Sequence, residues 1–205
     1  MCTAQYLKCS STTEVLTFTL PETSLGGLRA QTNMNHNKVS NSNNVLNCGL
    51  INARSVNNKT ESVVDFVLEH KLDILCITET WISVNDNFAT RNVTPIGYNI
   101  ISNSRNGKRG GGVAVILKDH LAYKKLITVV CDTFEVLLLR VTSCTKSFVI
   151  ATIYRSPGPL ANFLTELNNF IANLVSNSDD FVLAGDFNIH MDMTTDDSAR
   201  KLSVV

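Results

Sequence analysis

Hydrophobic positions along this chain fall into short runs from residue 45 onward. Residues 46–52 predict a first strand, and 73–78 form a nearly continuous apolar run, as expected of a central strand covered on both faces. The Asn-Gly pair at 106–107 and the Gly triplet at 110–112 favour a hairpin between strands at 98–102 and 112–117. Runs rich in β-branched residues predict five further strands, at 98–102, 112–117, 126–130, 134–141 and 148–154.

Two segments have the three-to-four-residue apolar period of amphipathic helices. The first spans 59–71 and begins after Asn58, a candidate N-cap, with Val63, Val64, Val67 and Leu68 facing inward. The second spans 160–176, and a last buried strand is predicted at 180–184. The order β-α-β, β-meander, α-β predicts an α/β protein with sheets packed together and helices outside.

Residues 1–44 have a different character from the rest. Seven of the fifteen residues from Asn33 to Asn47 are asparagine. Such a stretch buries too little apolar surface to offset the entropy lost on ordering. We expect 1–44 to be a mostly disordered lead-in, apart from a stray strand near residues 15–20, and 45–205 to be the folded domain.

Overall composition is that of a globular protein, with 44% hydrophobic and 18% charged residues. It excludes a fully disordered chain, a collagen-like repeat and a coiled coil. Lysine plus arginine and aspartate plus glutamate number 18 each. Because the formal net charge is zero, binding to nucleic acid would have to rest on a local basic patch.

The chain has no apolar run near the roughly 20 residues of a membrane helix and no export signal at its start. Its six cysteines form no C-x-x-C motif, which suits a reducing compartment. We therefore expect an intracellular protein of nucleus or cytoplasm, with no membrane partner and no obligate protein partner.

Polar side chains follow several of the predicted strands. Asn52, Glu79, Tyr154, Asp186 and Asn188 all lie where an apolar run ends. Strand ends of α/β sheets face crevices, so these side chains are candidates for one site. Carboxylate and amide oxygens are the ligands that a hard divalent cation such as Mg²⁺ takes, together with a substrate phosphate. A carboxylate held by an amide can also deprotonate a water.

Four segments around these residues resemble successive motifs of the endonuclease/exonuclease/phosphatase superfamily, and most of all its branch in LINE-like (non-LTR) retrotransposons. They read LINARS at 50–55, ITETW at 77–81, IYRSP at 153–157 and GDFNIH at 185–190. The resemblance implies a DNase I-like four-layer α/β/β/α fold, in which a two-sheet β-sandwich is flanked by helices.

The resemblance also implies roles. Glu79 would bind Mg²⁺ (or Mn²⁺), with Asn52 beside it in the metal shell. Asp186 would activate the attacking water, Asn188 would position Asp186 or the phosphate, and Tyr154 would hydrogen-bond the scissile phosphate. The implied reaction is metal-dependent hydrolysis of a phosphodiester, with DNA as partner through its phosphate backbone.

Basic residues near these motifs could form a rim for that backbone. Arg54, Arg155 and His190 are interpreted as substrate contacts, whereas direct catalysis by His190 is disfavoured. Arg105, Lys108, Arg109, Lys124 and Lys125 extend the rim, although the alternative of solvated hairpin charges is equally open.

The sequence departs from the superfamily pattern, whose members carry a later Asp and a terminal Asp-His motif. We therefore expect a domain truncated at its C-terminus, with an impaired site and weak or absent activity. Two other functions remain open. One is a phosphatase or phosphodiesterase acting on inositol lipids or sphingomyelin. The other is a non-catalytic remnant that binds nucleic acid or protein.

Overall fold

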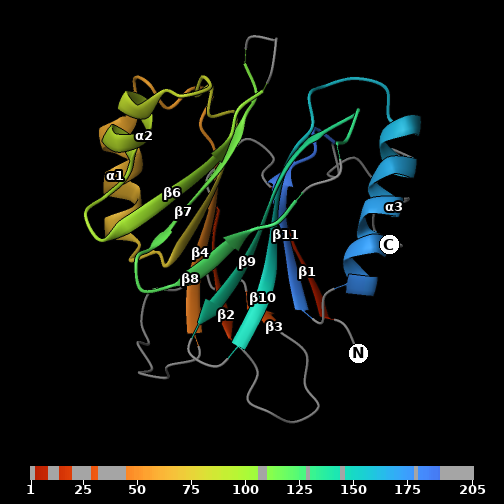
Figure 1. The fold of residues 1–205 in the computed structure, drawn as a ribbon, viewed down its shortest axis with the longest axis horizontal. Helices are drawn as coiled ribbons and strands as arrows, with labels where there is room; N and C mark the ends of the chain where they lie inside the picture. The colour runs from red at the N-terminus through yellow and green to blue at the C-terminus, as the bar shows by residue number, and fades with distance from the viewer. Residues whose placement is uncertain are drawn as a thin grey trace.

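A computed structural model describes the chain at 45–105, 110–127, 130–143, 146–177 and 180–189, and the backbone alone at 3–8, 14–19 and 29–31. Two mixed sheets face each other across the middle of the molecule (Figure 1). The six-stranded sheet has the order β3-β2-β4-β5-β7-β6 and the five-stranded sheet the order β1-β11-β10-β9-β8. The elements are β1 (Thr3–Lys8), β2 (Glu14–Thr19), β3 (Arg29–Gln31), β4 (Val45–Asn52), α1 (Thr60–Glu69), β5 (Ile74–Thr78), α2 (Asn87–Val93), β6 (Tyr98–Asn103), β7 (Val113–Lys118), β8 (Ala122–Lys125), β9 (Glu135–Ser143), β10 (Lys146–Tyr154), α3 (Ala161–Asn177) and β11 (Asp180–Asp186).

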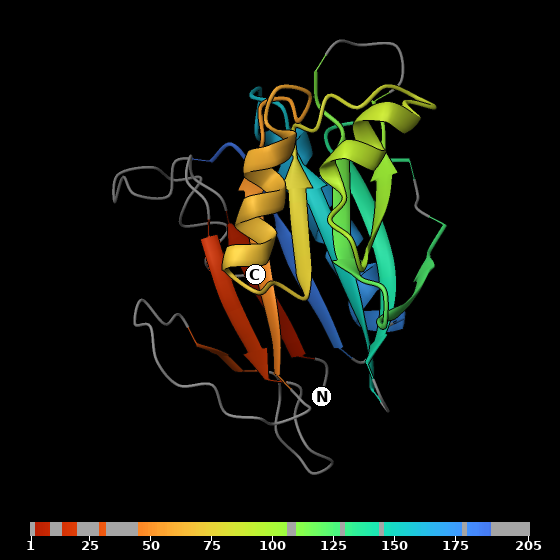
Figure 2. The same ribbon diagram turned by 90° about the vertical axis from the view of Figure 1, so that its left-hand side faces the viewer.

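Helices cover the outer face of each sheet (Figures 1 and 2). Helices α1 and α2 pack on the six-stranded sheet through a cluster that includes Val63, Val67 and Ile77. Helix α3 packs on the five-stranded sheet, with Phe163 fully buried. A third cluster lies between the two sheets, because alternate residues of each strand point to opposite faces. The predicted four-layer α/β/β/α fold is therefore confirmed.

Two parallel strand pairs determine where the site lies. Strands β4 and β5 pair in parallel, with Asn52 opposite Thr78, so Asn52 and Glu79 leave the six-stranded sheet at one end. Strands β10 and β11 also pair in parallel, with Tyr154 opposite Asp186. The carboxyl ends of these four strands carry the polar side chains singled out in the sequence.

Several predicted elements differ from the observed ones. A strand was predicted at 126–130, but residues 126–127 are irregular. The edge strand forms instead at the preceding, more polar residues 122–125. Helix α1 begins at Thr60 with Lys59 as its N-cap, and Leu68, predicted to face inward, is 50% exposed. Helix α2 was not predicted, because its seven residues are too few to show a period.

Three strands lie inside the segment that was predicted to be a mostly disordered lead-in. Strand β1 adds in parallel to β11, and β2 adds antiparallel to β4. Strand β2 matches the stray strand expected near residues 15–20, whereas β1 and β3 were not predicted, because the prediction averaged the composition of the whole segment. The unpaired N–H and C=O groups of a sheet edge can bind an added strand, and amino-acid composition gives no information about this pairing. The rest of 1–44 lies outside the described residues.

Candidate active site

The amide of Asn52 joins the two candidate carboxylates. Its Nδ2 donates to Glu79 Oε1 at 2.8 Å and to Asp186 Oδ2 at 2.7 Å, although Asp186 lies 134 positions further along the chain. Since both bonds share one nitrogen, the two carboxylate oxygens lie no further apart than the sum of these distances. The structure thus brings residues of both sheets together at one point.

Glu79 sits on a constrained backbone immediately after β5. Its φ of 51° lies in the left-handed region, which costs free energy for a residue with a Cβ. Neighbouring strand ends hold it there: Ser55 N–H donates to Glu79 O at 2.8 Å, and Thr80 N–H donates to Gly112 O at 3.1 Å. Such over-determined strain is typical of functional sites.

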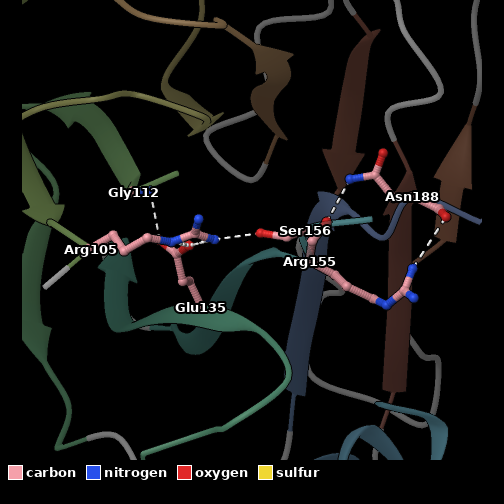
Figure 3. Close-up of polar contacts among 6 residues, drawn as sticks. All are labelled: Arg105, Gly112, Glu135, Arg155, Ser156 and Asn188. Atoms are coloured by element: carbon pink, nitrogen blue, oxygen red, sulfur yellow. Dashed lines mark hydrogen bonds and ion pairs between the residues drawn. The ribbon is translucent and has the colours of Figure 1, made fainter. Parts of the chain in front are cut away.

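Asp186 ends β11 with both carboxylate oxygens engaged. Oδ2 accepts from Asn52, and Oδ1 accepts from the backbone N–H of Asn188 at 3.0 Å. Asn188 has a φ of 48°, and its Nδ2 donates to Arg155 O at 2.5 Å (Figure 3). Asp186 is 7% exposed. Its carboxylate is therefore held in a fixed orientation at the edge of the core.

Tyr154 is buried beside these carboxylates and remains protonated. Burial, and to a lesser extent the negative charge of the nearby Glu79 carboxylate, raise the pKa of Tyr154 to about 12. Ser156 and the positive charge of Arg105, whose guanidinium carbon lies 5.6 Å from the centre of the Tyr154 ring, oppose this rise. The phenol is thus a neutral hydrogen-bond donor at neutral pH.

This raised pKa predicts a pH dependence of stability. In the unfolded chain Tyr154 would titrate near 10, so the folded state binds its proton more tightly. The corresponding stabilisation is fully present below about pH 10 and is lost as pH rises through about 12. In urea unfolding, the free energy of unfolding of the wild type should fall relative to that of Tyr154→Phe as pH rises from about 10 to about 12. A difference that stays constant with pH would contradict this assignment.

Arg155 was predicted to contact the substrate, but its guanidinium is buried and donates to backbone carbonyls instead. It is 2% exposed, and its guanidinium donates to Phe187 O at 3.0 Å, to Asn188 O and Pro159 O at 3.2 Å, and to Gly158 O. Its donors are directed at the main chain that carries Asn188 (Figure 3). We therefore correct the interpretation: Arg155 holds the loop after β11 in place.

The other two predicted substrate contacts have different outcomes. Arg54 is exposed and lies two residues after Asn52, whose Oδ1 accepts from Arg54 N–H at 3.2 Å. His190 lies outside the described residues, as do Lys108 and Arg109. A substrate contact by Arg54 or His190 stays a prediction.

Glu135 and Ser156 lie near Tyr154 but were not assigned to the site from the sequence, and Arg105 was predicted only as part of the basic rim. Arg105 donates from Nε to Glu135 Oε1 and from Nη2 to Ser156 Oγ, each at 2.5 Å (Figure 3). Glu135 lies opposite Tyr154 in the antiparallel pairing of β9 and β10. Position alone was a usable signal for Ser156, which follows the Tyr154-Arg155 motif, but nothing in the sequence links Arg105 to Glu135.

The donor set suits a hard divalent cation. Glu79 and Asp186 present carboxylate oxygens that converge on one amide, and oxygen ligands of this kind bind Mg²⁺. Asn52 turns its nitrogen to both carboxylates and its oxygen to Arg54, so a ligand role for Asn52 stays a prediction. Within the described ranges, no cluster of three or more His, Cys, Asp or Glu side chains is present.

A sequence profile of the endonuclease/exonuclease/phosphatase family matches residues 30–203. The chain belongs to this family. The match covers most of the 205 residues, including all of the strand ends that build the site. Enzymes of the family generally use divalent metal ions. A comparison with curated proteins finds no match.

Solved structures share the fold at low sequence identity. The endonuclease domain of TRAS1, a telomere-specific non-LTR retrotransposon, aligns with a TM-score of 0.58 and 13% identity over 77% of this chain and 67% of that domain. An AP endonuclease from Archaeoglobus fulgidus aligns with a TM-score of 0.54 and 18% identity over 76% and 68% of the two chains.

A phosphatase shares the fold equally well. The mannosyl-6-phosphatase Bt3783 of Bacteroides thetaiotaomicron aligns with a TM-score of 0.57 and 16% identity, over 77% of this chain and 69% of that one. Coverage of an AP endonuclease from Leishmania major is lower, at 54% of its length. The family is thus shown, whereas the fold alone does not separate a nuclease from a phosphatase.

No helix in the described part of the chain has both the length and the apolar character needed to cross a membrane.

Proposed function

We propose that this chain hydrolyses phosphodiester bonds of DNA with a divalent cation, as a nicking endonuclease of the retrotransposon type. The observation that carries the proposal is the shared Asn52 amide, which draws the Glu79 and Asp186 carboxylates from two sheets to one point. A purely structural role would not call for two converging carboxylates, because their like charges repel each other.

Asp186 is the proposed general base. Its carboxylate is oriented by Asn52 at one oxygen and by the Asn188 N–H at the other. A base fixed in this way can accept a proton from an attacking water without first reorganising. Asn188 is in turn held by Arg155, through its side-chain amide and its carbonyl.

Tyr154 is the proposed donor to the phosphate. A tyrosine phenol is protonated at neutral pH, and the raised pKa of Tyr154 preserves that state with the Glu79 carboxylate nearby. A phosphate bound next to Glu79 would therefore meet a neutral donor.

Glu79 is the proposed ligand of the cation. Asn52 is proposed to lie beside Glu79 in the coordination shell of the same cation. A bound Mg²⁺ or Mn²⁺ would neutralise charge that develops on the phosphate oxygens.

Arg54 supports DNA rather than a small phosphate ester as substrate. It is exposed directly after the β4 end that carries Asn52, where an extended polyanion could reach it. Phosphatase activity on a monoester or a lipid headgroup remains the alternative, since the same carboxylates would serve it.

Purified protein should convert supercoiled plasmid to the nicked form in Mg²⁺ or Mn²⁺, and excess chelator should abolish the conversion. Single-turnover conditions with protein in excess make slow nicking measurable. Phosphate release from inositol-phosphate and sugar-phosphate substrates, measured in parallel, separates the two functions. Release of phosphate without plasmid nicking would reject the DNA proposal, and the absence of both would favour a non-catalytic remnant.

A further inference from the structure

We propose that the indole of Trp81 is a platform on which an unpaired DNA base stacks, next to the phosphate that the candidate site would cleave. The identity of the substrate rests on the proposed function. Stacking can be measured without cleavage, so the two can fail separately.

Trp81 lies within reach of the candidate site. It follows Glu79, the proposed ligand of the cation, by two residues, in the chain that leaves the end of β5 and leads into α2 (Figure 2). Consecutive Cα atoms are about 3.8 Å apart, so the Cα atoms of these two residues are separated by about 7 Å at most. A strand whose phosphate is bound beside Glu79 can therefore present a neighbouring base to the indole.

Trp81 is not part of the hydrophobic core. It is 39% exposed and belongs to none of the three apolar clusters formed by the described residues. The adjacent Ile82 packs this segment instead, since it is 4% exposed and lies in the cluster beneath α1 and α2. Tryptophan is buried to a large extent on average, so an indole exposed beside a candidate site indicates a contact with a ligand rather than a packing role.

The backbone that carries the indole is firmly held. Trp81 N–H donates to Gly111 O at 2.9 Å, and the preceding Thr80 N–H donates to Gly112 O at 3.1 Å. Gly112 N–H in turn donates to Glu135 Oε2 at 2.6 Å, which ties the segment to the other sheet. Trp81 has a φ of 55°, in the left-handed region that is unfavourable for a residue with a Cβ. A side chain positioned in advance in this way loses less entropy when it binds a ligand.

Gly110 lies against one edge of the indole. A Cβ at this position would be 3.6 Å from Nε1 and 3.7 Å from Cε2 of Trp81. The φ of Gly110 is 83°, a conformation that glycine adopts without steric cost. No side chain from residue 110 therefore covers the ring.

Stacking on an indole requires a base with a free face. In duplex DNA both faces of a base are covered by its neighbours, so the expected partner is a base in a single strand or at a locally unpaired position. Because every base has a π-face, this contact would not depend on sequence. Inositol phosphates and sugar phosphates have no aromatic face, so the contact would favour DNA over these substrates.

Trp81 is the single tryptophan of the chain, so tryptophan fluorescence reports this residue alone. The full chain is titrated with a short oligothymidylate and with an abasic strand of the same length, in excess chelator so that neither strand is cleaved. A base stacked on an indole quenches its fluorescence, so the oligothymidylate should quench the signal and the abasic strand should not. Equal quenching by the two strands, or quenching by neither, would overturn the inference.

Substitutions at Trp81 separate stacking from a general apolar contact. Trp81→Phe keeps an aromatic face, whereas Trp81→Leu keeps only apolar bulk. The affinity for a labelled oligothymidylate, measured by fluorescence anisotropy, should fall about 5- to 100-fold in Trp81→Leu and less in Trp81→Phe. Tyr123→Leu, which removes an aromatic ring that is 42% exposed on β8, is the matched control and should bind as the wild type does. Equal affinity of all four proteins would contradict the stacking role.

Plasmid nicking by the same proteins separates this inference from the proposed function. Base-specific quenching in a chain that does not nick DNA would support stacking on Trp81 and reject the proposed function. Nicking without base-specific quenching would uphold the proposed function and reject the stacking role of Trp81.

Discussion

Replacing Glu79 with Gln should reduce Mg²⁺-dependent plasmid nicking by about 100-fold or more, since the cation's charge stabilisation would be lost. The substitution keeps the size of the side chain and its position after β5. It removes the negative charge that would hold the cation. The amide oxygen of the glutamine can still accept the hydrogen bond from Asn52 Nδ2. Replacing Asp186 with Asn should lower the rate by about 100- to 10,000-fold through loss of the general base. Initial rates of nicking under single-turnover conditions provide the measurement.

The two substitutions should not be additive. If Glu79 and Asp186 act as one unit around Asn52, the double variant should lose little more than the worse single variant. Asp119→Asn, at an exposed turn after β7, is the matched control and should retain the wild-type rate. Equal nicking by the wild type and both single variants would remove the basis for the site assignment.

Arg155→Ala should lower the free energy of unfolding by about 3 kcal/mol or more, the largest effect on stability that we expect from one side chain near the site. The guanidinium is buried and donates to four carbonyls, of Gly158, Pro159, Phe187 and Asn188. Its removal would leave several of them without a partner and would lose the contact of the guanidinium carbon, 4.9 Å from the centre of the Phe163 ring.

Urea unfolding of Arg155→Ala and Arg155→Lys tests this role. Lysine keeps the charge, but its ammonium cannot span carbonyls from two loops, so it should recover only part of the stability. Arg140→Ala should fall within about 0.5 kcal/mol of the wild type, as is usual for an exposed position. A fully stable Arg155→Ala protein with weakened DNA binding would instead restore the original interpretation of a substrate contact.

Much of the fold was predictable because the strands appear in the sequence as apolar runs that end in a polar residue. Asn52, Glu79, Tyr154 and Asp186 each follow an apolar run, and parallel pairing of β4 with β5 and of β10 with β11 brings such ends to one edge. The sequence alone therefore identifies these four polar residues as candidates for one site.

The roles of the arginines could not be predicted. Arg155 and Arg105 both lie near the motifs as unspecified positive charges. Whether a guanidinium contacts a substrate or a carbonyl depends on segments that are distant in the sequence, such as residues 187–188 for Arg155. The Arg105–Glu135 ion pair likewise forms only because the two sheets pack with these strand ends adjacent.

The start of helix α1 shows a similar limit. Asn58 was a reasonable N-cap by type, yet the cap is Lys59, and no side-chain capping bond is formed. Lys59 instead directs its Nζ to Ala53 O at 2.5 Å, in the turn that follows β4. Contacts to a neighbouring turn thus outweighed the local preference for asparagine.

Binding of Mn²⁺ to the wild type and to Glu79→Gln, compared by isothermal titration calorimetry, tests the central claim most directly. We expect the wild type to have one binding site that is lost or weakened at least about tenfold in Glu79→Gln and in Asp186→Asn, and that is retained in Asp119→Asn. Equal Mn²⁺ affinity in all four proteins would contradict it, because the converging carboxylates would then have no part in holding a cation.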